Sequence, residues 1–294
     1  MLANSGLSKS TRNIYENRFR LHVLPYWSKV KLKEITPSKI KEWRLDVLTK
    51  RGMSIKSINY IVTVLGVVLN QAVVDGLITN NPVKYVSKLK DNAEKKDAFT
   101  LSEIKVLLNA SPEKSLYMMI LIGAITGMRR SEILGITESS LQKGYIDVSK
   151  QKEIKGYGYV STKTRECRKI IVPECILNKL AEQLVIQEDF SERVCFGQNI
   201  NYYNTRMTKL IKQNINKDER KVSFHSLRHF FNTYLLSENV SPAKVAGVLG
   251  HSTGLGSMTA LYTNWKPEHF KEVLEAQEKL LKLLLEDDEK DIKK

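Results

Sequence analysis

The sequence predicts a mainly α-helical protein with a small antiparallel β-sheet, in which an N-terminal helical bundle precedes an α+β domain. Apolar residues recur at three- and four-residue steps along most of the chain, which is the spacing of one face of a helix. Short runs rich in Ile, Val and Tyr lie between residues 145 and 172, separated by glycines as strands are. The polar residues 91–98 show neither pattern and predict a linker.

The first domain, residues 1–90, is expected to be helical throughout residues 9–87, with breaks after its longest helix. Thr36 followed by Pro37 is typical of a helix start, because threonine caps the first turn and proline fits its first position. Apolar residues from Ser54 to Val74 share one helical face. These stripes are expected to form the core of the bundle.

The second domain, residues 99–294, opens with Thr100 and Glu103 in the spacing of a capping box, and a helix is expected from Ser102 to about Asn109. The pattern then predicts one apolar helix over 115–135 and strands over 145–149, 157–161 and 168–172. Further helices are expected at about 174–187, 201–215, 225–237, 242–249 and, as a C-terminal interaction helix, about 267–286.

The charge balance favours a polyanionic partner. The 294 residues carry a formal net charge of +15, and the isoelectric point is about 9.5. Residues 1–97 hold 18 Lys and Arg against 8 Asp and Glu, so most of the excess lies in the N-terminal third. Such an excess is typical of nucleic-acid binding. From charge alone, solubility and an acidic protein partner remain alternatives.

The cysteines and the N-terminal segment indicate in which cellular compartment the protein is expected. Cys167, Cys175 and Cys195 fit neither a zinc ribbon nor a CxxC motif, which predicts reduced thiols in a cytoplasmic protein. The first residues show no apolar region of a secretion signal. No apolar run is expected to reach the roughly 18 residues of a membrane span, so no membrane partner is expected.

Six residues in the last two thirds of the chain suggest one kind of chemistry. Two arginines can bind the non-bridging oxygens of a phosphodiester. A lysine can give a proton to a departing oxygen, and a tyrosine oxygen can attack phosphorus, without a carboxylate cluster for a metal. The six residues are Arg129, Lys163, His225, Arg228, His251 and Tyr262.

Taken singly, most of these residues have a structural interpretation as well. Arg129 could pair with Glu132 along a helix, Lys163 could be the solvated tip of a hairpin, and His251 could simply follow a helix end. Tyr262 could be a core or interface aromatic, although it is the only tyrosine beyond His251. The order and combination of the residues favour the catalytic interpretation.

The paired histidines have a separate alternative. His225 and His229 are four residues apart, as two metal ligands on a helix can be, but no acidic residue or cysteine adjoins them. We therefore expect no metal site. Tyr234, beside Phe230 and Phe231, is expected to be a core residue rather than a competing nucleophile.

Together, these motifs resemble those of the tyrosine recombinases, also called phage-type integrases. The family pattern is TGxRxxE, a hairpin lysine, HxLRH, LGH and a tyrosine. It is matched by TGMRRSE at 126–132, Lys163, HSLRH at 225–229, LGH at 249–251 and Tyr262. The helical domain resembles the SAM-like core-binding domain of the family in size, charge and position, and residues 99–294 resemble its α+β catalytic domain.

The resemblance implies a site-specific DNA recombinase that needs neither metal nor ATP and works through a 3′-phosphotyrosyl intermediate and a Holliday junction. The implied roles are nucleophile for Tyr262, phosphate binding for Arg129 and Arg228, general acid for Lys163, acceptance or orientation of the tyrosine proton for His225, a hydrogen bond to the phosphate for His251, and support of an arginine for Glu132.

The implied partners are double-stranded DNA recombination sites, a homotetramer on DNA and DNA-bending accessory proteins, with no cofactor, in association with the nucleoid. The apolar stripe of the C-terminal helix is expected to dock on a neighbouring subunit, and packing on its own domain is the alternative. The small residues between His251 and Tyr262 predict a tyrosine that is mobile until DNA assembly.

Two alternative functions remain, a type IB topoisomerase-like enzyme and an architectural DNA-binding protein without catalysis. The HSLRH and LGH motifs favour a recombinase over a topoisomerase, and the intact set of six residues argues against a decayed site. Among recombinases, a mobile-element integrase is favoured. The family's small arm-binding domain is not visible, which predicts either a simple recombinase or a chain that starts at the core-binding domain.

Overall fold

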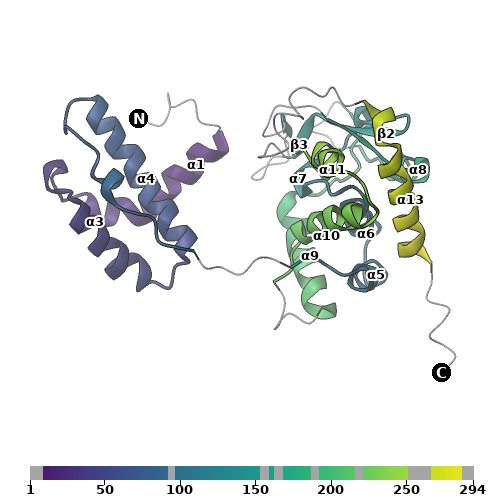
Figure 1. Cartoon of the computed structure of the whole chain (residues 1–294), viewed down its shortest axis with the longest axis horizontal. Coiled ribbons are helices and arrows are strands. Elements are labelled where there is room, and N and C mark those ends of the chain that lie inside the picture. Colours follow the sequence, from purple (N-terminus) through teal and green to yellow (C-terminus); the bar gives the residue numbers. More distant parts are fainter. Residues whose placement is uncertain are drawn as a thin grey trace. The chain divides into compact units, whose positions relative to one another are not determined.

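The computed structural model describes residues 9–91, 97–152, 159–161, 168–186, 192–215, 221–250 and 266–286. The chain divides into two compact units, Met1–Glu94 and Lys95–Lys294, each with its own hydrophobic core (Figure 1). The division falls within the predicted linker. The described part is mostly helical with small antiparallel sheets, so the predicted fold class is confirmed.

Unit 1 is a helical bundle. Helix α1 (Lys9–Arg18) continues through a π-helical segment, Phe19–Val23, into α2 (Leu24–Trp27). Helix α3 (Pro37–Trp43) continues through a second π-helical segment, Arg44–Thr49, and is followed by α4 (Ile55–Val74). Short 3-10 turns lie at Leu32–Glu34 and Pro82–Tyr85. Thr36 caps α3 as predicted, because its Oγ1 accepts from the backbone N–H of Lys39 at 3.3 Å.

Helix α4 supplies the centre of the unit 1 core. Its inward residues include Ile58, Ile61 and Leu65, which pack with Trp27 and Trp43. By length and composition alone, α4 is apolar enough to cross a membrane, so the expectation that no such run exists is wrong. Because its apolar face is buried in the bundle, the same composition is explained by its place in the core.

Unit 2 is built around α6 (Lys114–Thr126), which is buried along almost its whole length beside α5 (Leu101–Asn109). The predicted capping box of α5 is present, with Thr100 and Glu103 each bonding the other's backbone N–H. The predicted single helix over 115–135 is wrong. Gly127 adopts a φ of +61° and ends α6, and the chain starts again as α7 (Arg130–Ile133).

Two small antiparallel sheets cover one side of unit 2. Strands β1 (Leu141–Gln142), β2 (Tyr145–Val148) and β5 (Arg168–Ile171) form one sheet in the order β1-β2-β5, with Ile146 opposite Ile170. Strands β3 (Lys150–Lys152) and β4 (Tyr159–Ser161) form the other. The three predicted strands correspond to β2, β4 and β5. The sequence analysis missed β1 and β3, which are too short to show an alternating pattern.

The later helices of unit 2 are α8 (Glu174–Ala181), α9 (Ile200–Asn214), α10 (His225–Ser237) and α11 (Pro242–Leu249). Helix α8 is shorter than predicted, because Val185 leaves the helical path and exchanges two 2.9 Å backbone hydrogen bonds with Val194. Helix α10 lies directly against α6 at Gly123, where an added Cβ would be 2.9 Å from atoms of Leu227 and Phe224.

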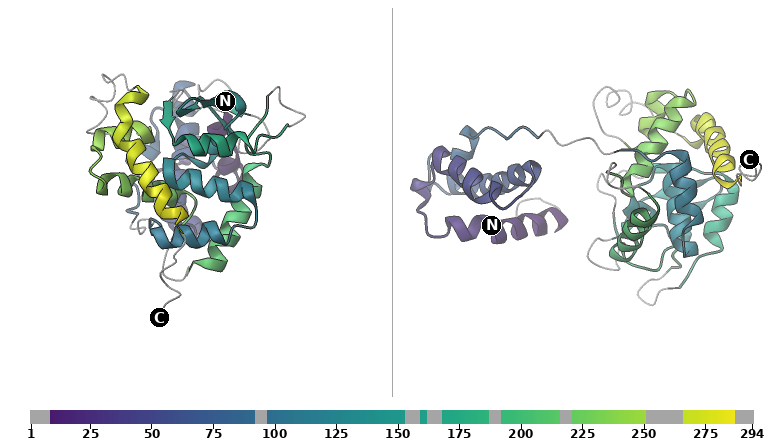
Figure 2. Two further views of the ribbon diagram at one scale, coloured as in Figure 1. Left: turned by 90° about the vertical axis from the view of Figure 1, so that its right-hand side faces the viewer. Right: turned by 90° about the horizontal axis from the view of Figure 1, so that it is seen from below.

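The C-terminal helix α13 (Lys271–Leu285), preceded by a 3-10 turn at Pro267–Phe270, packs on its own unit against α5 and α6 (Figure 2). Its apolar stripe is part of the unit 2 core, which is the alternative packing named above, and docking on a neighbouring subunit stays a prediction. Gln277 fixes the helix from within, because its Nε2 donates to the carbonyl oxygens of Ile125 at 2.9 Å and Ile171 at 3.0 Å.

Candidate active site

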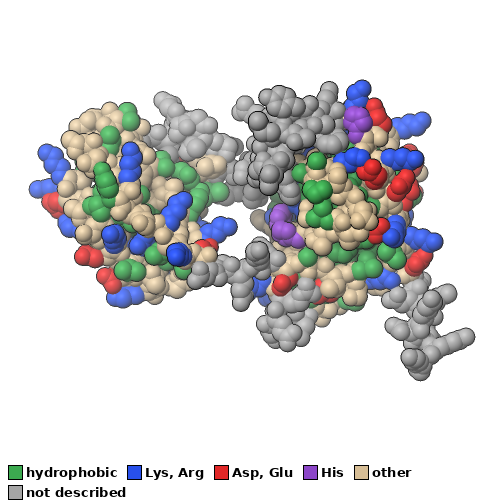
Figure 3. All heavy atoms as spheres, in the orientation of Figure 1, with side chains coloured by type: hydrophobic (Ala, Val, Ile, Leu, Met, Phe, Trp, Pro, Cys, Tyr) green, Lys and Arg blue, Asp and Glu red, His purple; other side chains and the backbone are tan. Residues whose placement is uncertain are grey.

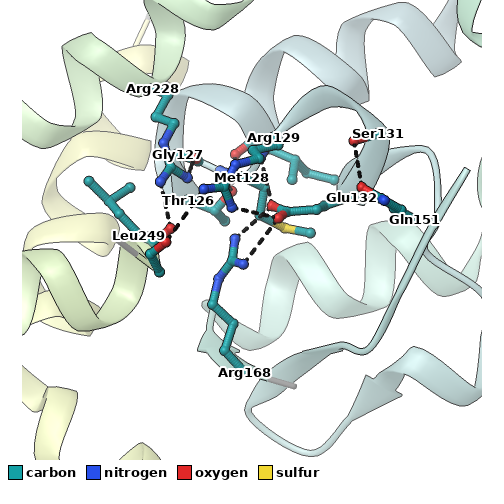
Figure 4. Close-up of polar contacts among 12 residues, drawn as sticks. Thr126, Gly127, Met128, Arg129, Ser131, Glu132, Gln151, Arg168, Arg228 and Leu249 are labelled. Atoms are coloured by element: carbon teal, nitrogen blue, oxygen red, sulfur yellow. Dashed lines mark hydrogen bonds and ion pairs between the residues drawn. The ribbon is translucent and has the colours of Figure 1, made fainter. Parts of the chain in front are cut away.

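Arg129 is positioned by the break between α6 and α7. It is the residue before the first turn of α7, and its backbone N–H donates to Oε2 of Glu132 at 2.8 Å. The Arg129 side chain returns to the same carboxylate, with Nη1 2.9 Å from Oε1 (Figure 4). The predicted contact between the two residues is therefore present, and Glu132 holds both ends of Arg129.

Arg168 completes this cluster from the other side. At the start of β5, its Nη1 and Nη2 donate to Oε1 and Oε2 of Glu132 at 3.0 and 2.6 Å, a bidentate pair (Figure 4). Such pairs combine charge with fixed geometry. From the sequence, Arg168 was predicted only as the beginning of a strand. Its signal was faint: a basic residue that opens an apolar strand soon after Lys163.

The buried carboxylate remains charged in this setting. Burial alone would raise the pKa of Glu132, but hydrogen bonds and charge from Arg168, and then from Arg129, hold it below the ordinary value. Only 3% of the residue is exposed. One anionic group therefore orients two guanidinium groups from two different segments.

Arg228 reaches the same region from α10 but is held in another way. Its Nη1 donates to the carbonyl oxygen of Gly127 at 2.8 Å, and its Nη2 donates to the carbonyl oxygen of Leu249 at 2.5 Å (Figure 4). Both partners are neutral, and the residue is only 4% exposed. Burial, followed by the charges of Arg129 and Arg168, lowers the pKa of Arg228 to about 9, although Glu132 acts in the opposite direction.

The two arginines converge on one turn. Nη2 of Arg129 lies 3.4 Å from the carbonyl oxygen of Gly250, next to the Leu249 carbonyl that Arg228 binds. Gly250 has a φ of +64°, and a Cβ there would lie 3.1 Å from Nη1 of Arg168. The turn that ends α11 is thus packed between three guanidinium groups, immediately before His251 in the chain.

His225 and His229 lie at the start of α10. Both are exposed, and their rings meet edge to face with centroids 5.0 Å apart. Within the described residues, no group of three or more His, Cys, Asp or Glu is arranged to hold a metal ion. His225 and Arg228 both lie in the first turn of α10. One predicted histidine is therefore near the arginines.

Three predicted site residues, Lys163, His251 and Tyr262, lie outside the described residues, as does the predicted mobility of the tyrosine. Tyr234 lies within them. It stacks on Phe230 with ring centroids 6.0 Å apart, and burial, followed by Glu238, raises its pKa to about 12. That environment suits a structural tyrosine, because an activated nucleophile needs its pKa lowered.

The surface of unit 1 carries many basic groups. Figure 3 shows Lys and Arg side chains spread among apolar ones on the face of this unit in view. The local excess of positive charge counted in the sequence is thus displayed on the outside of the helical bundle. Such a surface attracts a polyanion at long range.

Comparison with known proteins gives matches over both units. Residues 97–269 match the Phage integrase family, and residues 3–47 match the N-terminal SAM-like domain of phage integrases. The chain is 25% identical over 296 residues to the tyrosine recombinase XerD of Rickettsia bellii, covering 93% of this chain and 94% of that one. It is 22% identical to the ICEBs1 integrase of Bacillus subtilis, covering 92% and 79%.

Two solved structures show the same fold. The Tn1549 transposon integrase in complex with a circular intermediate DNA superposes with a TM-score of 0.70 at 23% identity, covering 89% of this chain and 91% of that one. A lambda integrase tetramer bound to a Holliday junction gives a TM-score of 0.70 at 18% identity, covering 90% and 76%.

The fold, a helical unit followed by a mostly helical unit with small antiparallel sheets, is that of DNA integrases, and the chain belongs to the phage integrase family. It is a tyrosine site-specific recombinase, an enzyme that cleaves and rejoins DNA.

Proposed function

We propose that Arg129 and Arg228 bind the two non-bridging oxygens of the phosphate that is cleaved, and that Tyr262 attacks that phosphate. The attack forms a bond between the tyrosine oxygen and phosphorus while the bond to the 5′-oxygen breaks. Lys163 protonates the leaving 5′-oxygen, so a 5′-hydroxyl is released. The phosphotyrosine conserves the energy of the phosphodiester, and its later attack by a 5′-hydroxyl rejoins the strand.

The observation that carries this proposal is the convergence of Arg129 and Arg228 on the Leu249–Gly250 turn. The two guanidinium groups come from different helices, and one carboxylate balances only part of the positive charge. A site with surplus, preorganised positive charge stabilises the additional charge on phosphate oxygens in the transition state. His225, on the turn of α10 that also carries Arg228, is suited to accept or orient the tyrosine proton.

Glu132 and Arg168 act through Arg129 in this mechanism. Glu132 fixes the backbone and side chain of Arg129, and Arg168 fixes Glu132. Because Arg168 follows Lys163 by five residues, this contact also ties the strand after the lysine to the arginine motif. His251, directly after the turn that both arginines contact, is suited to donate a hydrogen bond to the phosphate.

For the biological reaction, we propose strand exchange between two sites of a mobile element by a tetramer, through a Holliday junction. Supporting this are the likeness to the ICEBs1 and Tn1549 integrases and the lambda integrase tetramer bound to a Holliday junction. The basic unit 1 would hold one face of the duplex, and DNA-bending proteins are candidate accessory partners. The 25% identity to the tyrosine recombinase XerD makes recombination outside a mobile element the alternative to exclude.

The test is covalent trapping on a duplex that is nicked close to the cleavage position and taken from the ends of the element. Wild type and Tyr262→Phe are compared on a denaturing gel, with and without a chelator. The proposal expects a chelator-resistant protein–DNA band in wild type and none in the variant. Tight binding without any band would instead support a purely architectural protein.

A second assay separates recombination from topoisomerase activity. Two linear duplexes, each with one site, are mixed, and the products are resolved by length. Recombinant lengths and junction intermediates support strand exchange. Relaxation of supercoiled plasmid without recombinant products would support a type IB topoisomerase-like enzyme.

A further inference from the structure

A pocket lined by Arg130 lies beside the arginine cluster. It has a volume of about 190 Å³ and opens between the start of α7, one side of α9 and the segment that leads into α10. None of the described residues that line it is acidic. They are Arg130, Asn204, Met207, Thr208, Ile211, Val222, Ser223 and Phe224.

Arg130 brings a charge to this pocket without a matching one. Its Nη1 donates to Oδ1 of Asn204, a neutral partner, and its Nε is buried with no partner among the described residues. Burial lowers the pKa of Arg130. A desolvated cation that has only a neutral partner is costly, and an anion in the pocket would offset that cost.

The remaining polar groups of the lining are suited to an anion. Because Oδ1 of Asn204 accepts from Arg130, its Nδ2 is the atom that can donate to a ligand. Thr208 and Ser223 add two hydroxyl groups, and Ser223 and Phe224 immediately precede the 13-residue helix α10. The N-terminal end of a helix favours negative charge.

The position of the lining residues along the chain indicates which anion the pocket would bind. Arg130 directly follows Arg129, and Phe224 directly precedes His225. Consecutive Cα atoms are about 3.8 Å apart, so the pocket adjoins residues that are proposed to face the cleaved phosphate. A phosphate in this pocket would therefore be a near neighbour, along the strand, of the phosphate that Arg129 binds.

We propose that this pocket is a second phosphate site, in which Arg130, Asn204, Thr208 and Ser223 hold a DNA backbone phosphate next to the cleaved one. The proposal rests on the proposed function, because that function places DNA against Arg129. A contact of this kind sets the register of the duplex on the protein without reading bases. It would fix the cleaved bond relative to the arginine cluster.

The first test is the salt dependence of binding to an uncleaved duplex, in a Tyr262→Phe background. Each phosphate contact contributes about 0.9 to the slope of log K against log salt concentration. Arg130→Gln is expected to reduce the slope by about this amount. Arg193→Gln is the matched control: it removes the same charge from the same unit, but Arg193 is already paired with Glu138.

The second test locates the contact. Single phosphates near the cleavage position are replaced by uncharged methylphosphonates, and binding is measured for each duplex. Replacement at one position should weaken binding of the Tyr262→Phe protein. The same replacement should have no further effect on binding of the protein that also carries Arg130→Gln. Thr208→Val keeps the charge and leaves the core untouched, so it should weaken the contact at that same position even if Arg130→Gln fails to fold.

An unchanged slope, or equal losses at every phosphate, would overturn the second site. These outcomes are separable from a failure of the proposed function. The salt slope and the methylphosphonate series are measured on uncleaved DNA. The proposed function is tested separately, by the covalent protein–DNA band of the wild type.

Discussion

Arg129 and Arg228 are proposed to bind one phosphate, yet the protein holds them in opposite ways. The carboxylate side of the site consists of Arg129, Glu132 and Arg168, in which one buried anion orients two cations. On the carbonyl side, the hydrogen-bond partners of Arg228 among the described residues are the backbone oxygens of Gly127 and Leu249. The first side neutralises one of its two cations with an anion, whereas the second keeps a desolvated cation without a charged hydrogen-bond partner among the described residues.

The difference separates two tasks. The carboxylate side is stabilised by strong, charge-assisted hydrogen bonds in the free protein and supplies fixed geometry. The carbonyl side is costly until an anion arrives, since burial lowers the pKa of Arg228. We therefore expect changes on the carboxylate side to affect stability most and changes on the carbonyl side to affect cleavage most.

The largest effect on stability is expected for Glu132→Gln. Removing the charge leaves two guanidinium groups facing a neutral amide in a buried place, which typically costs about 3–5 kcal/mol. Chemical denaturation at pH 7 measures this. Glu138→Gln, which breaks the exposed pair with Arg193, is the control and should change little. Equal effects of the two variants would contradict the comparison.

The same variant gives a pH dependence of defined sign. The pKa of Glu132 is lowered in the folded state, so its contribution to stability is complete above the ordinary value of about 4.5 and is lost as pH falls through the folded value. The gap between wild type and Glu132→Gln should therefore be constant near neutrality and close in acid. A gap that widens in acid would show that Glu132 is not the charged partner.

The largest effect on cleavage is expected for Arg228→Lys. Lysine keeps the positive charge but cannot hold two carbonyl oxygens and a phosphate in one plane. Loss of one such donor typically slows the reaction about 10²- to 10³-fold. The rate of covalent band formation measures this, and thermal unfolding should shift far less than for Glu132→Gln. A stable and fully active variant would remove Arg228 from the site.

A smaller effect on cleavage is expected for Arg168→Lys. Because Arg168 acts through Glu132 on Arg129, we expect a loss of about 10- to 100-fold, as for other residues that orient a ligand. A substrate with a methylphosphonate at the cleaved position lacks the charge that Arg129 neutralises, so the defect should shrink to a few-fold. A defect of equal size on both substrates would indicate a purely structural role.

The smallest effect is expected for Gly250→Ala, with Gly144→Ala as its control. Both glycines have positive φ, so alanine costs about 1–2 kcal/mol at either position. A Cβ at Gly144 would meet nothing within 4 Å, whereas at Gly250 it would press on the Arg168 guanidinium. Both variants should lose similar stability, but only Gly250→Ala should also slow covalent trapping, by a few-fold. Identical trapping rates of the two variants would show that the turn at Gly250 does not affect cleavage through Arg168.

The sequence predicted local features better than tertiary ones. The helix starts at Thr36 and Thr100 were predictable, because capping depends on residues three apart. The break at Gly127 was not predictable, since glycine inside an apolar run can either continue a helix or end it. The choice depends on its φ, which the sequence does not show. The packing of α13 on its own unit was given only as the alternative, because a stripe of apolar residues does not specify which surface it covers.

For the site, residue types that occur in motifs were predictable, whereas the contacts between motifs were not. Glu132 was named as a support for an arginine from the resemblance of its motif to the family pattern. Arg168 is 36 residues away in the chain and contacts it only through the fold of β5. Whether Lys163, His251 and Tyr262 act as predicted stays a prediction.

Gly123, in the middle of α6, gives the interior of unit 2 a part in the proposed chemistry. The helix that ends just before Arg129 and the helix that carries Arg228 touch at this residue, where an added methyl group would displace the side chains of Leu227 and Phe224. Because glycine has no side chain, the two helices approach closely here, and this approach helps to set the distance between the two arginine motifs. A larger residue at this position is therefore expected to disturb the geometry of the two arginines as well as the stability of the fold, although Gly123 is buried in the core.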